Sequence, residues 1–180
     1  MMTEIMEKLR TALNEAGVFQ HGIVNPMDIE FTQEVRALCE ENRCRQYGKS
    51  WACPPAVGTV DECRERCQKY ENMLVFTGKY DIEDSFDIEG MMDAMKEFKK
   101  VAEKLDERIA GLFGDYLLLA NEGCGYCEKC TYPDAPCRFP DRAHGSIEGY
   151  GIFVNILAQK AGINYINGEN TITYFGALLF

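Results

Sequence analysis

Three cysteines recur at intervals of three residues in the stretch C-G-Y-C-E-K-C, as Cys124, Cys127 and Cys130, and Cys137 follows shortly after. Thiols this close in the chain are poorly placed to pair with one another as disulfides. A [4Fe–4S] cubane takes four thiolates, and a loop with a cysteine at every third position can supply three of them while the fourth comes from elsewhere. The glycines on either side of Cys124 free the backbone to curl around a bulky group. The spacing therefore indicates an iron–sulfur site.

Zinc is the main alternative at this loop. A zinc knuckle uses one C-x2-C pair and a second pair elsewhere, so a third cysteine in phase is redundant unless Cys127 or Cys130 is a bystander. The chain has two histidines, His21 and His144, and they give little support for a mixed Cys/His site. Thiol redox chemistry and simple packing are the remaining interpretations of the loop.

The fourth ligand is open between two cysteines. Cys137 is near in sequence but separated from the trio by a stretch with two prolines, whereas Cys53 precedes Pro54, and a cysteine followed by proline is common for a distant cluster ligand. Cys44 and Cys53 flank Y-G-K-S-W-A, an irregular segment suited to a metal loop. Its tryptophan, Trp51, would shield a cluster from water or form ordinary core.

The other cysteines have structural explanations. Cys63 and Cys67 share a helical face with apolar neighbours, where buried cysteine behaves as a small hydrophobe, although an i, i+4 pair can also bind a metal. Cys39 fits a core position and a ligand position equally well. A second cluster around Cys44 would draw on one or more of these three thiols.

Composition and charge narrow the class of protein. The chain has 180 residues, enough for one domain, and we expect residues 1–180 to form a single metal-binding domain. Its formal net charge of −10 argues against a nucleic-acid partner. No membrane-spanning run and no signal sequence are expected, and nine cysteines without an export signal predict free thiols in the cytoplasm.

The apolar periodicity predicts an α/β fold: a single layered domain with a mixed β-sheet flanked by helices and cysteine-rich metal loops. The strand before the cysteine loop, Y-L-L-L-A, would be its rigid base. Asn167-Gly168 predicts a hairpin turn near the C-terminus. Helices are expected at 3–16, 33–41, 60–71, 90–110 and 147–160, and strands at 18–24, 73–79 and 115–120.

Polar residues after the cysteine loop suggest two further roles. Ser146 is expected to cap the helix 147–160, and its amides with Arg138 and Arg142 could hold an anion, although a cap with solvated arginines is the simpler interpretation. His144 could shuttle protons to a substrate bound at a cluster, or serve only a structural role. No nucleotide-binding motif is present.

Three segments of the chain resemble the family of predicted metal-binding proteins known as DUF2284: C-R-Q-Y-G-K-S-W-A-C-P-P at 44–55, C-G-Y-C-E-K-C at 124–130, and P-C-R-F-P-D-R-A-H-G-S-I-E-G-Y-G-I at 136–152. The resemblance covers most of residues 39–180. It implies a metal site that is built on six cysteines: Cys44, Cys53, Cys124, Cys127, Cys130 and Cys137.

The sequence thus predicts an iron–sulfur protein of redox metabolism with one or two [4Fe–4S] clusters, acting in electron transfer or as an accessory to a redox enzyme. A redox protein or enzyme would be its partner. Two alternatives stay open: a catalytic cluster with an open iron that binds substrate, and a zinc-binding or metal-delivery module. Whether the protein is an enzyme, and through which catalytic residues, is undetermined by the sequence.

Overall fold

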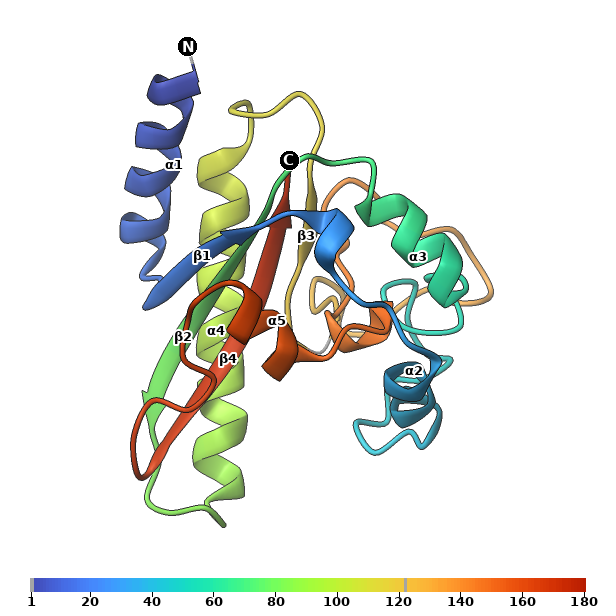
Figure 1. Ribbon diagram of the computed structural model, residues 1–180. Helices are drawn as coiled ribbons and strands as arrows, with labels where there is room; N and C mark the ends of the chain where they lie inside the picture. The colour runs from blue at the N-terminus through green and yellow to red at the C-terminus, as the bar shows by residue number, and fades with distance from the viewer. Residues whose placement is uncertain (1, 122) are drawn as a thin grey trace.

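A computed structural model describes residues 2–121 and 123–180 as helices packed against both faces of one sheet (Figure 1). The expected α/β arrangement is confirmed. In chain order the elements are α1 (Met2–Ala16), β1 (Gln20–Val24), the 3-10 helix η1 (Pro26–Asp28), α2 (Gln33–Glu40), α3 (Val60–Cys67), β2 (Met73–Asp81), α4 (Ile88–Ile109), β3 (Leu117–Leu119), the 3-10 helix η2 (Glu148–Tyr150), α5 (Val154–Lys160) and β4 (Thr171–Leu179).

The sheet has the strand order β1-β2-β4-β3, and each neighbouring pair is antiparallel. The expectation of a mixed sheet is therefore wrong. The interleaving of helices with strands suggested parallel crossovers, but the long connections between strands bring each strand back in the opposite direction. The last strand, β4, lies in the centre, between β2 and β3.

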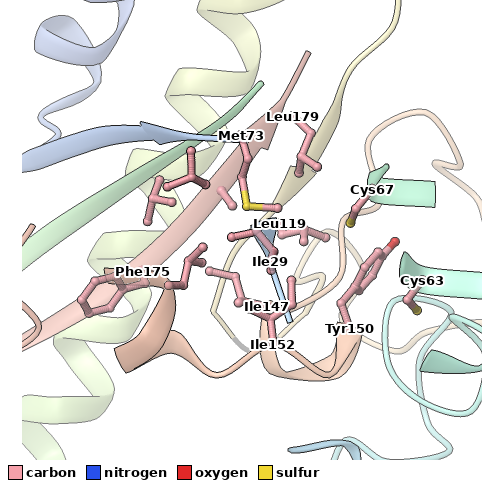
Figure 2. Close-up of a cluster of buried hydrophobic side chains, with 14 of the residues drawn as sticks. Ile29, Cys63, Cys67, Met73, Leu119, Ile147, Tyr150, Ile152, Phe175 and Leu179 are labelled. Atoms are coloured by element: carbon pink, nitrogen blue, oxygen red, sulfur yellow. The ribbon is translucent and has the colours of Figure 1, made fainter. Parts of the chain in front are cut away.

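Both faces of the sheet are covered, because successive residues of a strand point to opposite sides. On one face Leu74 and Phe76 of β2 pack with α1 and α4. On the other face Met73 and Val75 pack with η2, α5 and the cysteines of α3, as Figure 2 shows around Met73. The start of β2 is consequently buried on both sides and reads as a continuous apolar run.

The predicted helix 147–160 is broken in two. Ser146 Oγ accepts a hydrogen bond from the Gly149 amide, as a cap would, but only the short η2 follows. Gly151 then adopts a left-handed φ of 82°, and a Cβ at that position would meet the Thr32 carbonyl oxygen at 2.9 Å. The chain restarts as α5 at Val154. With three residues in η2, the proposed anion site at a helix start loses its basis.

The hairpin predicted at Asn167-Gly168 is also wrong. Gly168 does turn the chain, with a φ of 117°, but the strand that follows finds its partners far away in sequence. β4 pairs with β2 over its whole length and with β3 at its end. Long-range pairing in the centre of the sheet buries more apolar surface than a local hairpin could.

No helix in the described ranges combines the length and apolar character needed to cross a bilayer.

The packing of α4 on the sheet generates a stability prediction. Phe98 is fully buried, with its ring centroid 5.7 Å from that of Phe76 and 6.1 Å from that of Tyr174. Phe98→Ala should lower the free energy of unfolding by about 3–5 kcal/mol, because it leaves a cavity between helix and sheet. Phe86→Ala is the control, since that ring is 87% exposed. In urea unfolding the control should stay within about 0.5 kcal/mol of the parent; equal losses for both variants would contradict this packing.

Candidate metal centre

The cysteine loop begins and ends at one point of the sheet edge. β3 ends at Leu119, and the next residue, Ala120, donates its amide to the Gly145 carbonyl at 2.9 Å and forms a parallel bridge with Ser146. Everything between these residues projects from this closed base. The rigid base expected after Y-L-L-L-A is thus present, although the regular strand is only Leu117–Leu119.

The structure brings all four cysteines of the loop to one pocket. Cys124, Cys127, Cys130 and Cys137 line it together with Ser50, Trp51 and Ala52 of the irregular segment before α3. The pKa of the Cys124 thiol is raised by burial, and its three companions raise it further, which shows that the sulfur atoms lie within electrostatic range of one another.

Cys130 is the thiol that the pocket prepares best for ionisation. Burial raises its pKa, but hydrogen bonds to the sulfur from the Tyr132, Trp51 and Thr131 amides and from the Ser50 hydroxyl outweigh it, and the pKa lies below its usual value. Donors aimed at sulfur stabilise a thiolate and adjust the potential of a thiolate-bound cluster.

Trp51 joins the two segments that form the pocket. Its indole Nε1 donates to the Ala135 carbonyl at 3.0 Å, and its ring meets the Tyr132 ring edge-on at 4.9 Å between centroids. The tryptophan is half-buried over the thiols. Sequence reasoning anticipated Trp51 but missed Ser50. The only available signal for that serine was its place in the irregular segment between Cys44 and Cys53.

Cys53 lies outside this pocket, against the start of the loop. It is buried, and a Cβ at Gly123 would come within 2.8 Å of its sulfur. Gly123 has a φ of 60°, so both its conformation and this close approach require glycine. Cys53 therefore supports the loop from behind, while Ala52 beside it faces the thiols.

The remaining cysteines lie around α2 and α3. Cys44 is exposed, and it lies close enough to Cys39 to raise the pKa of that thiol, which burial raises most. Cys63 and Cys67 are fully buried in the core (Figure 2). Arg36 Nη2 donates to the Cys63 sulfur at 3.4 Å. All nine cysteines are free thiols.

Two more observations concern the fit of a metal group. In the part of the chain that the structure describes, no three His, Cys, Asp or Glu side chains converge closely enough to hold a metal ion. The Asn121 side chain, buried where the loop leaves the sheet, has no hydrogen-bond partner for its Oδ1 or its Nδ2 among the described residues. A buried amide is normally satisfied, by protein, water or a bound group.

Comparison with known proteins gives one match. A family model described as "Predicted metal-binding protein (DUF2284)" matches residues 22–180. The chain belongs to this family. Neither a curated protein nor a solved structure shows a significant match to it. Membership in DUF2284 confirms the suspected resemblance and supports metal binding by a cysteine-rich protein; the identity of the metal and of its ligands is a separate question.

The contrast between the thiols generates a labelling prediction. In reduced, metal-free protein at about pH 7, iodoacetamide should modify Cys130 well before Cys67, because only the thiolate reacts. The pKa of Cys130 is lowered, whereas burial raises that of Cys67 to about 12. Mass spectrometry of peptides from a time course measures both rates, and protein unfolded in urea is the control in which the difference should vanish. Equal rates in the folded protein would contradict the described pocket.

Proposed function

We propose that this DUF2284 protein binds a [4Fe–4S] cluster on Cys124, Cys127, Cys130 and Cys137 and takes part in redox metabolism, in electron transfer or as an accessory to a redox enzyme. One observation carries the proposal: all four thiols of a loop with C-x2-C-x2-C spacing line the same pocket. When bound, such a cluster supplies reversible one-electron transfer.

The donor set supports a cluster over zinc. Four thiols and no histidine line the pocket, and its polar neighbours donate hydrogen bonds to sulfur rather than offering further ligands. A cubane spreads its thiolates over four irons, so its ligands need not converge on one atom. The buried Asn121 amide at the base of the loop also fits a polar group bound nearby. A structural zinc site would require the same thiols to close around a single ion.

Cys137 supports the role of a carrier. If it is the fourth ligand, each iron has one thiolate and no iron is open to substrate. In the protein itself, the amides of Trp51 and its neighbours would hold the sulfur ligands, and the Trp51 ring would keep water from them. We place the protein in the cytoplasm, where free thiols persist, with a redox protein or enzyme as its partner.

Cys44 and Cys53 remain proposed ligands of a second metal group. Cys44 has Cys39 as a neighbour at the end of α2, and the nearby Cys63 is held by Arg36 of the same helix. A second cluster here would double the iron content of the chain.

Iron and acid-labile sulfide per chain test the cluster in anaerobically purified protein. One cubane gives about four of each and two give about eight. Cys127→Ser should lower both by about four, because it removes a ligand. Cys67→Ala, which changes a buried thiol outside the pocket, should retain them. Unchanged iron in Cys127→Ser, or stoichiometric zinc without a visible absorption band in the parent, would refute the assignment.

The fourth ligand is tested by a second pair of variants. Cys137→Ser should release the loop's cluster or leave an open iron, seen as a changed electron paramagnetic resonance spectrum of the reduced protein that added small thiols alter. Cys53→Ser should keep the parent spectrum of the loop's cluster, because Cys53 lies behind the loop and outside the pocket. The opposite pattern would identify Cys53 as the fourth ligand and refute the role given to Cys137.

A further inference from the structure

A second cavity lies next to the thiol pocket. Its volume is about 450 Å³, within the range of small-molecule sites, and it is enclosed by the end of α4, by residues 114–118 and by residues 140–144. Ala143 lines this cavity and also the thiol pocket, so the segment 140–144 forms the wall between them. The polar residues of the cavity are Asp106, Asp115, Tyr116, Asp141, Arg142 and His144.

His144 presents a hydrogen-bond acceptor to this cavity. The ring is 7% exposed, and its Nδ1 lies 3.1 Å from the Arg142 carbonyl oxygen. Because a carbonyl only accepts, Nδ1 carries the proton, and Nε2 is left as an acceptor. No hydrogen bond to Nε2 is made by any residue of the described ranges 2–121 and 123–180. Burial lowers the pKa of the imidazole, which favours its neutral form.

Asp106 and Tyr116 add acceptors to the same wall. The Tyr116 hydroxyl donates to Asp106 Oδ1 at 2.8 Å, which uses the phenol proton and leaves lone pairs on both groups. Asp106 is 8% exposed. Asp115, at the rim, accepts a hydrogen bond from Tyr70. These groups have acceptor capacity to spare, and their own donors are already used.

The one guanidinium of the cavity is engaged elsewhere. The Arg142 guanidinium carbon lies 4.5 Å above the centroid of the Tyr126 ring, and its Nη2 lies 3.9 Å from Glu107 Oε1. Three carboxylates, of Asp106, Asp115 and Asp141, therefore face the cavity against one arginine that is turned to other partners. A ligand that fits must bring hydrogen-bond donors and positive charge.

We propose that this cavity binds a small organic cation, a protonated amine, whose N–H groups are held by Asp106, Tyr116 and His144. The bound amine would lie on the far side of the segment 140–144 from the four thiols. The proposal concerns binding only and does not depend on which metal group the thiols hold.

Three isosteric probes test the charge preference: butylammonium, butyrate and 1-butanol, each titrated calorimetrically into anaerobically purified protein at constant ionic strength. Butylammonium should bind saturably with a Kd on the order of 1 mM, an ordinary affinity for so small a ligand. It should bind about tenfold or more tightly than either isostere, a difference of charge alone. No saturable binding, or equal binding of butyrate, overturns the proposal.

Variants locate the site. Asp106→Asn keeps the shape and should weaken butylammonium binding about tenfold or more by removing one charge. Asp141→Lys changes an exposed rim residue, so folding should be unaffected, and it should weaken butylammonium and strengthen butyrate. Glu169→Lys makes the same charge change in an exposed turn outside the cavity and should have little effect. If Glu169→Lys weakens binding as much as Asp141→Lys does, the attraction is due to net charge and the proposed site is refuted.

Discussion

The hydrogen bond from the Ala120 amide to the Gly145 carbonyl closes the base of the cysteine loop, and the arrangement of the site depends on it. β3 is a short edge strand that pairs only with the end of β4, so it could not by itself fix so long an excursion of the chain. The contact with Gly145 and the bridge to Ser146 make the loop leave and rejoin the sheet at one place. This constraint brings Cys137, late in the loop, back to the three cysteines at its start.

The same closure explains why a second segment of the chain takes part. The loop has few apolar residues of its own, and its thiols are covered by residues 50–52, which are fixed by the bond from Trp51 to the Ala135 carbonyl. Gly123 allows Cys53 to pack directly behind the loop. On the return path the segment 140–144 separates the thiols from the acidic cavity at the end of α4. One backbone segment thus serves two sites of opposite chemistry, one rich in sulfur and the other in carboxylates.

Local patterns predicted the parts of this protein whose causes are local. The capping box of Thr59 and Glu62 is present at the start of α3, and the apolar stripe of α4 packs on the sheet as its periodicity indicated. The sheet was predicted less well, because β4 pairs with distant strands and no local signal marks its partners. Likewise the spacing of the cysteines predicted a shared site for the trio but not the choice between Cys137 and Cys53. That choice depends on how the loop closes and on which side of Gly123 each sulfur lies.

Anomalous diffraction from crystals grown anaerobically is the most direct test of the central claim, that the four thiols of the loop hold a cubane. Data collected on either side of the iron absorption edge should show a compact group of iron peaks enclosed by Cys124, Cys127, Cys130 and Cys137, one iron next to each sulfur. A single peak at the zinc edge bound by these sulfurs, or an iron group that takes a ligand from Cys53 in place of Cys137, would contradict the account.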